Sequence, residues 1–218
     1  MDFAAARRNM IDCQVLPNRV TDARLIDAMS ALPREAFVPE GKRSLAYIDE
    51  ALDVGFGRCL MEPMIIARLL QAARISPDDV VLAIGCGAGY AAALLSKLAN
   101  TVVVVESDKD LAQQAEATMS KLGIDTVAVI DGKMANGYPK QAPYDVIFFD
   151  GAVPEIPEKI QKQLADGGRL VAVQSRPDSK VGSAVLVANL NGNISRRDLF
   201  DAGTPDMPGF EREEAFTF

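Results

Sequence analysis

The second half of the sequence alternates short apolar runs with segments rich in helix-forming residues. The apolar runs are DDVVLAIG, TVVVVE, TVAVI, YDVIFF and RLVAVQ, and the first helical segments between them are GYAAALLSKLA and DLAQQAEATMSKLG. A strand that is apolar along its whole length is buried on both faces, as happens when helices cover both sides of a parallel sheet. The pattern therefore predicts a doubly wound α/β domain with a mostly parallel sheet. PEIPEKIQKQL is the helix expected before the last of these strands.

The segments on either side of this region extend the same domain. Residues 1–75 show helical patterns and a glycine-containing stretch, and residues 76–218 hold the α/β core. The segments SAVLVANL and ISRRDLF, joined by NGN, predict an antiparallel C-terminal hairpin, because Asn-Gly adopts positive φ readily. We expect a single domain over residues 1–218 with an N-terminal helical extension. For the final PDMPGFEREEAFTF, packing on the sheet and extending freely both stay open.

The charge balance and the histidine content exclude several classes of function. Lys and Arg number 23 against 30 Asp and Glu, so the formal net charge is −7. An acidic surface repels phosphate backbones, so we expect no nucleic-acid partner. The chain has no histidine, which excludes Ser-His-Asp and Cys-His catalysis and most imidazole-based metal sites. We therefore expect no metal.

The cysteines and the N-terminus indicate a compartment. Cys13, Cys59 and Cys86 are odd in number, far apart and without CxxC spacing, which is typical of reduced thiols in the cytoplasm. The N-terminal MDFAAARRNMIDCQ lacks the apolar stretch of a signal peptide, and no apolar run approaches the length of about 18 residues that a membrane span needs. We expect a cytoplasmic protein without a membrane partner, and its oligomeric state stays open.

A glycine-rich loop follows the first apolar strand. In VLAIGCGAGY, Gly85, Cys86, Gly87 and Gly89 let the backbone turn tightly and approach a ligand beside a helix N-terminus. A plain tight turn between strand and helix is the alternative. The third glycine comes one residue earlier than in the dinucleotide fingerprint GxGxxG, and the compact GxGxG form is more typical of S-adenosyl-L-methionine (SAM) binding.

Acidic residues end the next three strands. Glu106, about twenty residues beyond the glycines, can accept both ribose hydroxyls. Asp131, followed by Gly132, can reach an adenine amino group, and Asp150 ends the following strand. Each alone is more often a plain strand-end turn, and for Glu106 a helix cap or a solvated loop carboxylate is the alternative. Together they lie at the carboxyl ends of successive strands, where open α/β sheets bind ligands, so we expect all of them near a SAM cofactor.

These motifs resemble those of the protein-L-isoaspartate O-methyltransferases, which are class I SAM-dependent methyltransferases. LIDAMSALPREAFVPEGKRSLAYIDEAL is similar to the family's N-terminal segment, VGFG to the approach to its substrate loop, VLAIGCGAGY to its SAM motif, Asp131-Gly132 to its adenine contact, YDVIFFDGAVPEIP to its fourth-strand motif and GGRLVAV to its next strand. The resemblance covers most of the chain. It implies a Rossmann-like fold and a protein-repair activity, in which the α-carboxylate of isoaspartyl residues in damaged proteins is methyl-esterified.

The resemblance also implies a substrate site that this sequence has altered. The family's loop reads close to GYGQTISQP, whereas this chain has GFGRCLMEP. Met61 takes the place of the serine regarded as the active-site residue, and a thioether cannot donate a hydrogen bond as a hydroxyl does; no catalytic residue is therefore assigned. Glu62 adds a negative charge, and Arg58 is the candidate for holding a substrate carboxylate. The implied substrate-site residues are Gly57, Arg58, Cys59, Leu60, Met61, Glu62, Pro63, Ala152, Val153 and Pro154.

A carboxylate acceptor suits a chain without histidine. Its unperturbed pKa is about 4, so it is already ionised at neutral pH and needs no general base. Methyl transfer to a protein or peptide carboxylate is the leading hypothesis. The second is a family member that lost catalysis and acts as a SAM-binding or regulatory protein, which Met61 and Ala83 (where VLEIG is usual) favour. The third is a methyltransferase for a different acceptor, with Glu62 or Asp150 as a base.

Overall fold

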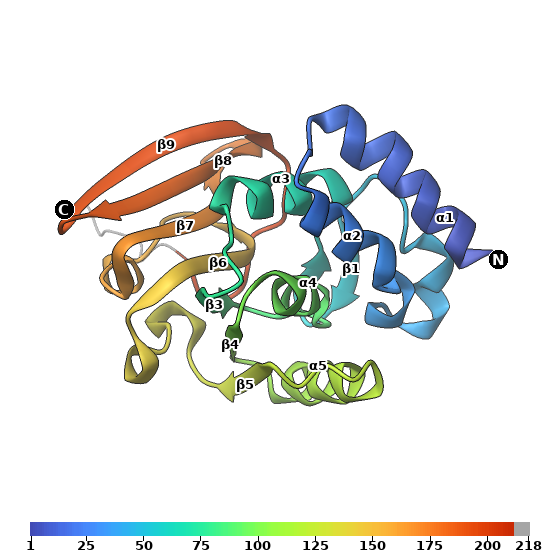
Figure 1. Cartoon of the computed structure of the whole chain (residues 1–218), viewed down its shortest axis with the longest axis horizontal. Coiled ribbons are helices and arrows are strands. Elements are labelled where there is room, and N and C mark those ends of the chain that lie inside the picture. The colour runs from blue at the N-terminus through green and yellow to red at the C-terminus, as the bar shows by residue number, and fades with distance from the viewer. Residues whose placement is uncertain (212–218) are drawn as a thin grey trace.

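One seven-stranded sheet organises the chain, with strand order β5-β4-β3-β6-β7-β8-β9 (Figure 1). The computed structural model describes residues 1–211. The parallel part of the sheet consists of β3 (Val80–Ile84), β4 (Thr101–Glu106), β5 (Val127–Asp131), β6 (Tyr144–Val153) and β7 (Leu164–Arg176). These are the five apolar runs of the sequence, and their parallel pairing confirms the predicted fold class.

The last two strands form the predicted hairpin. β8 (Ser179–Leu190) pairs antiparallel with β7 and with β9 (Asn193–Ala202). The turn between them holds Asn191 at φ 52° and Gly192 at φ 79°, the positive values that the Asn-Gly pair was expected to supply. The hairpin therefore gives the sheet its antiparallel edge.

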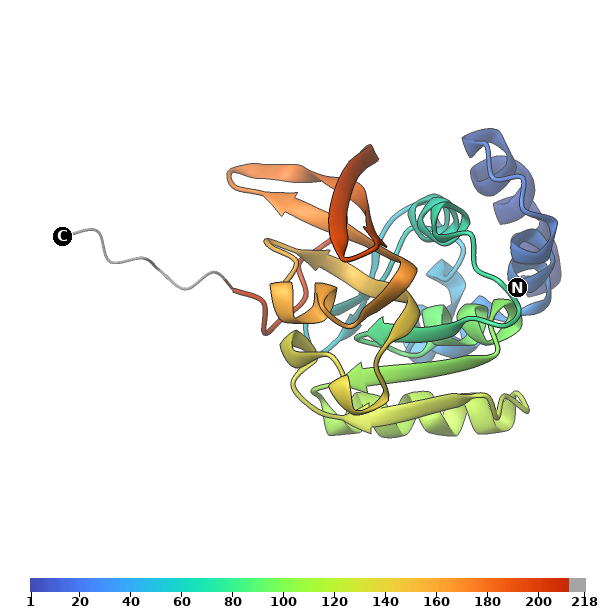
Figure 2. The same ribbon diagram turned by 60° about the vertical axis from the view of Figure 1, so that its left-hand side comes forward.

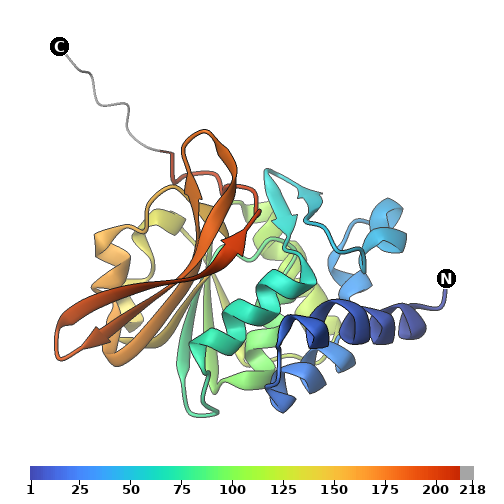
Figure 3. The same ribbon diagram turned by 90° about the horizontal axis from the view of Figure 1, so that it is seen from above.

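The N-terminal third is helical and ends in a small hairpin. Its elements are α1 (Phe3–Met10), a π-helical turn η1 (Ile11–Val15), the 3₁₀ turns η2 (Leu16–Asn18), η3 (Arg34–Phe37) and η4 (Glu40–Leu45), α2 (Ala23–Ala31), β1 (Leu52–Gly55), β2 (Arg58–Leu60) and α3 (Pro63–Ala73). β1 and β2 pair antiparallel around the tip at Phe56. Seen from above, α3 lies between the N-terminal helices and the β8–β9 hairpin (Figure 3).

The two faces of the sheet are covered unequally. On one face, side chains such as Val81 and Phe148 join a core with α3, α4 (Tyr90–Leu98) and α5 (Lys109–Lys121). Figure 2 shows α5 running along the β4–β5 edge. On the other face, side chains such as Leu82 and Phe149 form a second core. Its cover consists of short elements, η5 (Met134–Asn136), η6 (Pro139–Gln141) and α6 (Glu158–Gln161), together with residues near the C-terminus.

The helix expected over PEIPEKIQKQL is much shorter than predicted. α6 has four residues, and Pro157 immediately precedes it. Leu164 already pairs with Tyr144 as the first residue of β7, so the chain enters the sheet before a second helical turn can form. Residues 205–210 of the C-terminal segment pack against the rest of the chain through backbone bonds and the side chains of Met207 and Phe210. The rest of that segment lies outside the described residues.

The strand order places a topological switch point next to β3, the position at which open α/β sheets form a ligand crevice. From β3 the chain moves to β4 and β5 on one side, and then returns to β6 on the other side. At such a switch point the connections diverge, and the carboxyl ends of the strands leave room for a ligand. Within residues 1–211, no helix is both long and apolar enough to cross a membrane.

Candidate active site

The glycine-rich loop lies at the carboxyl end of β3 and requires its glycines. Gly85, Gly87 and Gly89 have φ values of 76°, 46° and 99°, a region that side chains disfavour. The Gly85 N–H donates to the Val105 carbonyl at 2.9 Å, which ties the loop to β4. Gly89 is the residue that caps α4 at its N-terminus. The loop therefore has the strained backbone of a ligand-approaching turn, and its role in holding a cofactor stays a prediction.

Glu106 lies at the end of β4 with its carboxylate fully buried and fully engaged. It accepts hydrogen bonds from the backbone N–H groups of Ser107 (2.7 Å), Asp108 (3.0 Å) and Cys86 (3.1 Å). Burial by itself would raise the pKa of Glu106, but the hydrogen bond and positive charge of Arg58 together with these N–H groups lower it overall. The Cys86 bond places the expected ribose acid directly against the glycine loop.

Arg58 lies on this carboxylate. Its Nη2 donates to Glu106 Oε1 at 2.6 Å and its Nε to Oε2 at 3.4 Å. Its Nη1 is buried without a hydrogen-bond partner among the described residues. The expectation that Arg58 holds a substrate carboxylate is untested, but in this structure its guanidinium occupies the polar face that ribose hydroxyls would need.

Asp150 lies within β6, whose following residues Gly151–Val153 are also buried, and it faces the same loop. Its Oδ2 would lie 3.8 Å from a Cβ at Gly87. Burial is the largest influence on its carboxyl and the charge of Glu106 the next; against the weaker opposing effect of Arg58 and Arg34, they raise the pKa of Asp150 to about 7. Burial therefore keeps the protonated form of the Asp150 carboxyl populated much closer to neutral pH than in an exposed aspartate.

The altered loop contributes mostly buried groups. Met61 is fully buried in the core, and its carbonyl accepts from Arg34 Nη2 at 2.5 Å. Burial, followed by the charges of Asp150 and Glu62, raises the pKa of Cys59 to about 12, so its thiol stays protonated and unreactive. Leu60 pairs with Leu52 in the β1–β2 hairpin, and Pro63 opens α3.

Glu62 is not compensated by Arg58. Burial and the nearby carboxylates of Asp49 and Glu50 raise the pKa of Glu62, so it belongs to a cluster of acids. Arg58 is committed to Glu106 instead. An anionic substrate approaching this side of the loop would meet negative charge.

Of the two residues expected near adenine, Asp131 forms an ion pair through its side chain and Gly132 a hydrogen bond through its backbone. Asp131 is exposed and forms an ion pair with Lys109 at 3.3 Å. The Gly132 N–H donates to the backbone carbonyl of Glu106 at 2.9 Å. Both residues therefore lie beside the end of β4, and their contact with adenine stays a prediction.

Sequence reasoning missed the segment that crosses the mouth of the site. The Ala152 N–H donates to the Pro205 carbonyl at 3.0 Å, and the Met207 N–H donates to the Ala152 carbonyl at 2.8 Å. This pairing sets residues 205–207 alongside the end of β6, where Val153 is buried and the Pro154 carbonyl accepts from Gln174. No periodic pattern in the sequence signals this contact.

Side chains of this segment fill space between the predicted cofactor and substrate residues. The Met207 Sδ lies 3.1 Å from where a Cβ at Gly85 would be, and its Cγ lies 2.4 Å from a Cβ at Gly151. Pro208 Cγ lies 2.9 Å from a Cβ at Gly57. Gly57, Gly85 and Gly151 are therefore the three points at which the backbone makes room for residues 207–208.

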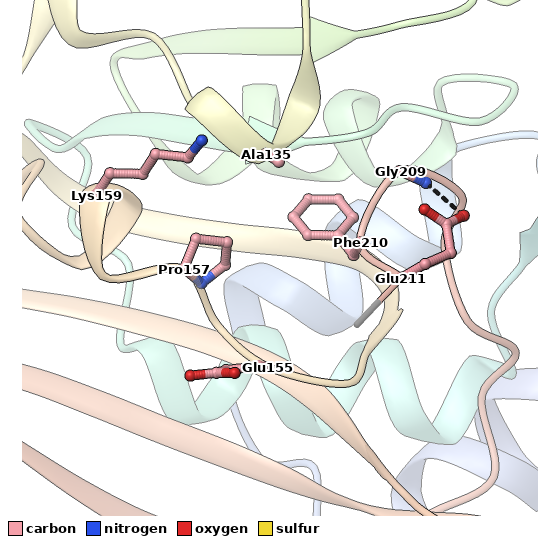
Figure 4. Close-up of a pocket in the computed structure, with 7 residues that line it drawn as sticks. All are labelled: Ala135, Glu155, Pro157, Lys159, Gly209, Phe210 and Glu211. Carbon is pink, nitrogen blue, oxygen red and sulfur yellow. Dashed lines mark hydrogen bonds between the residues drawn. The ribbon is translucent and has the colours of Figure 1, made fainter. Parts of the chain in front are cut away.

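A cavity of about 480 Å³ lies on the outer side of this segment (Figure 4). Its lining includes Ala135, Pro157, Lys159 and Phe210, and Phe210 stacks edge-to-face on Phe149 with ring centroids 5.8 Å apart. None of the predicted cofactor residues lines it. Within residues 1–211, no cluster of three or more Cys, Asp or Glu side chains is placed to hold a metal ion.

Comparison with known proteins identifies relatives across the chain. The sequence profile of the protein-L-isoaspartate(D-aspartate) O-methyltransferase family (PCMT) matches residues 6–196. The protein-L-isoaspartate O-methyltransferase of Roseiflexus sp. (strain RS-1) is 43% identical over 171 residues, covering 78% of each chain. The enzyme of the same name from Koribacter versatilis (strain Ellin345) is 39% identical over 199 residues, covering 91% of this chain and 89% of its own.

Solved structures give the same result for the fold. A protein-L-isoaspartate O-methyltransferase structure superposes with a TM-score of 0.82 and 26% identity, covering 94% of this chain and 67% of that chain. A Plasmodium falciparum protein described by the same activity, in complex with S-adenosyl-L-homocysteine, superposes with a TM-score of 0.79, 19% identity and coverage of 96% and 99%. The N-terminal helical region and the α/β core thus have counterparts in single solved chains.

Proposed function

The chain belongs to the protein-L-isoaspartate(D-aspartate) O-methyltransferase family, whose members depend on SAM, and we propose that it methyl-esterifies the α-carboxylate of isoaspartyl residues in damaged proteins. The observation that carries this proposal is the contact between the Cys86 N–H and the Glu106 carboxylate at 3.1 Å. It brings Glu106, the acid proposed to bind the ribose, against a glycine loop at the switch point of the sheet. The acceptor carboxylate is ionised at neutral pH, so the absence of histidine is no obstacle.

The residues around the crevice fit SAM in type and position. Gly85, Gly87 and Gly89 offer a backbone cradle, Glu106 offers a carboxylate for the ribose, and Asp131 with Gly132 borders the adenine end. Bound SAM supplies an activated methyl group. What the chain contributes is alignment of the acceptor and exclusion of water. The Met134 and Phe149 side chains, buried in the core beside this crevice, provide apolar walls.

Arg58 links the two halves of the proposed site. Because its guanidinium engages Glu106 here, Glu106 has to exchange this partner for ribose hydroxyls when the cofactor binds. Arg58 is then free to offer its fork to the substrate carboxylate.

Asp150 takes over the role that a serine hydroxyl would fill at Met61. In its protonated form, Asp150 can donate a hydrogen bond to the acceptor carboxylate, whereas the Met61 thioether cannot. Its raised pKa keeps this form populated near neutral pH. We therefore place the carboxylate-recognising groups on Arg58 and Asp150, between the loop at residues 57–63 and the turn at residues 150–154.

A second candidate function has its own supporting observation. The saturated Glu106 carboxylate and the Met207 side chain over Gly85 favour a family member that binds the cofactor weakly and acts as a binding or regulatory protein. The pKa of about 7 for Asp150 also suits a base acting on a neutral acceptor. Cofactor affinity and acceptor preference separate these possibilities.

The proposal includes a cytoplasmic location. Cys59 and Cys86 are buried free thiols and Cys13 is an exposed one, a state that a reducing compartment maintains. Partners would be damaged proteins or peptides. Nucleic acid is disfavoured by the net charge of −7.

The test is methyl transfer from labelled SAM to an isoaspartyl peptide, with the aspartyl peptide as control and base-labile label as the readout. Selective labelling is expected. Calorimetric titration with SAM accompanies it. Binding of SAM without methyl transfer to either peptide would support the regulatory alternative. Labelling of a neutral acceptor in place of the isoaspartyl peptide would support a methyltransferase for a different acceptor.

A further inference from the structure

A second cavity, of about 310 Å³, lies at the C-terminal end of α3 and shares no lining residue with the candidate active site. Three segments build it: the turn after η2, the end of α3, and β9. These segments lie side by side in the view from above (Figure 3). Its lining includes Arg19, Arg68, Arg74, Arg197, Leu199 and Phe200. Four arginines therefore line one cavity in a protein whose net charge is −7; Arg68 is half-buried and the other three are exposed.

None of these four arginines has a counter-ion among the described residues. They take part in none of the salt bridges within residues 1–211, and no Asp or Glu lines the cavity. Two acids close in sequence to the cavity residues, Asp198 and Asp22, have other partners. Asp198 pairs with Arg196 at 3.1 Å, and Asp22 Oδ1 accepts the backbone N–H groups at the start of α2. The positive charge of the cavity is thus left uncompensated.

Arg68 is the most buried of the four arginines and lies close enough to Arg19 to be affected by its charge. Burial, and after it the charge of Arg19, lowers the pKa of Arg68. Arg68 is held in place nevertheless, because its guanidinium stacks on the Phe200 ring at 3.7 Å from the centroid. An anion between the arginines would relieve the repulsion without moving them.

Two of the arginines lie on segments that Gln71 ties together. Arg19 and Arg74 both adopt left-handed conformations, with φ of 63° and 48°. They cap the C-terminal ends of η2 and α3, where glycine or asparagine is usual. Gln71 locks the two segments by accepting from the Thr21 N–H at 2.6 Å and donating to the Arg19 carbonyl at 3.0 Å. The geometry of the cavity is therefore built in before any ligand arrives.

A β-bulge completes the arrangement. In β9, Phe200 pairs with Ala184 and Arg197 pairs with Leu186, and the register shifts between these pairs. In an unbroken strand, residues 197 and 200 would point to opposite faces, because side chains alternate. The extra residue brings Arg197 and Phe200 to the same face, toward α3.

We propose that this cavity binds a small phosphorylated ligand carrying at least two negative charges. Guanidinium forks match phosphate oxygens, and four of them approaching from three segments suit a group with oxygens on several sides better than a planar carboxylate. The volume is that of a small-molecule site. This inference is independent of the methyl transfer proposed above, because it concerns a different cavity and a different ligand.

Isothermal titration of the full chain with pyrophosphate tests the proposal without any activity assay. We expect one saturable site whose affinity falls with added salt. Arg68→Gln and Arg197→Gln should each weaken binding by about tenfold, with near-native folding by circular dichroism. Arg43→Gln is the matched control, since Arg43 is an exposed arginine outside the cavity, and it should bind as the unaltered chain does.

Three further variants probe the geometry. Arg68→Lys and Arg197→Lys keep the charge but lose the fork, so they should fall between the unaltered chain and the glutamine variants. Phe200→Leu removes the ring under Arg68 and should weaken binding several-fold. The proposal is overturned if millimolar pyrophosphate gives no heat, if Arg43→Gln weakens binding as much as the cavity variants do, or if citrate binds while pyrophosphate does not.

Discussion

Arg58 and Glu106 form a buried ion pair across the candidate active site, with Nη2 and Oε1 2.6 Å apart and side-chain exposures of 2% and 0%. The two residues come from the β1–β2 hairpin and from the end of β4, 48 positions apart in the sequence. The pair closes the hairpin onto the sheet. It also joins the residue expected to hold the ribose to the residue expected to hold the substrate.

Breaking this pair should destabilise the fold. Arg58→Leu leaves the Glu106 carboxylate buried without its cation, so the free energy of unfolding should drop by about 3–5 kcal/mol at neutral pH. The difference in the free energy of unfolding between Arg58→Leu and the unaltered chain should be smaller in acid. The pKa of Glu106 is lowered in the folded protein, so its stabilising contribution is present above the unfolded pKa and disappears as pH falls through the folded one. Urea denaturation across pH measures both effects.

A double-mutant cycle supplies the control for that experiment. Glu106→Gln keeps the shape and removes the charge, and the double variant Arg58→Leu/Glu106→Gln should be more stable than Arg58→Leu alone. Additive losses would mean that the two side chains do not interact in solution.

Releasing Glu106 from Arg58 should separate cofactor binding from substrate binding. In Arg58→Gln, Glu106 no longer has to exchange a cation for ribose hydroxyls, so SAM should bind several-fold more tightly. The isoaspartyl peptide loses its carboxylate fork, and its KM should rise by about tenfold. Titration calorimetry and steady-state kinetics measure the two quantities. Weaker SAM binding in Arg58→Gln would contradict the exchange.

The activity should fall as the pH rises through the pKa of Asp150. That pKa is about 7, and only the protonated carboxyl can donate a hydrogen bond to an anionic acceptor. Asp150→Asn retains a donor at every pH, so its profile should lose the decline while keeping activity. Rates with the isoaspartyl peptide from about pH 6 to pH 9 provide the test. A rate that increases through neutral pH would instead identify Asp150 as a base.

The same carboxyl should make the protein less stable at neutral pH than in mild acid. Its pKa rises from 3.8 to about 7 on folding, so the folded chain holds a proton that the unfolded chain has released. The free energy of unfolding therefore falls as pH rises from about 4 to about 7 and then levels off, with a total change on the order of 4 kcal/mol. Asp150→Asn should flatten this slope. Urea denaturation at about pH 5 and about pH 8 tests this prediction, and the free energy of unfolding should be lower at about pH 8. The contribution of Glu106 changes only at lower pH, so it does not obscure the comparison.

The contact between Gly151 and Met207 should hold residues 205–208 in place. A Cβ at Gly151 would lie 2.4 Å from Met207 Cγ, so Gly151→Ala should displace the segment and cost about 1–3 kcal/mol. Met207→Ala removes the clashing atom, and the double variant should recover part of the loss. Thermal denaturation of the three variants tests this. Equal stability of Gly151→Ala and the unaltered chain would show that the segment does not lie there in solution.

Much of the fold follows from local patterns. The five apolar runs form the five parallel strands, because apolar side chains on both faces of a strand favour burial on both sides. Asn191-Gly192 forms the hairpin turn, because these two residue types adopt positive φ readily. The helix expected after Pro157 was too long, since Leu164 is drawn into the sheet by pairing with Tyr144, an interaction between segments that local propensity does not register.

In the candidate site, too, local features were predicted from the sequence and contacts between distant segments were not. Its glycine loop and its strand-end acids were identified from spacing, because in a parallel sheet every strand ends at the same edge. The partner of Arg58 was not, and neither was the position of Met207 over Gly85. These contacts depend on how the β1–β2 hairpin and the residues after β9 return to the mouth of the crevice.

The sequence by itself determined the parallel sheet, the glycine loop and the placement of acids at strand ends, because periodicity and backbone preference act over a few residues. Only the tertiary structure decided that Arg58 neutralises Glu106, that burial raises the pKa of Asp150 to about 7, and that four arginines from three segments line one cavity. Charge and desolvation depend on which distant groups come within a few ångströms. That proximity is set by the strand order, the bulge in β9 and the returning C-terminal segment.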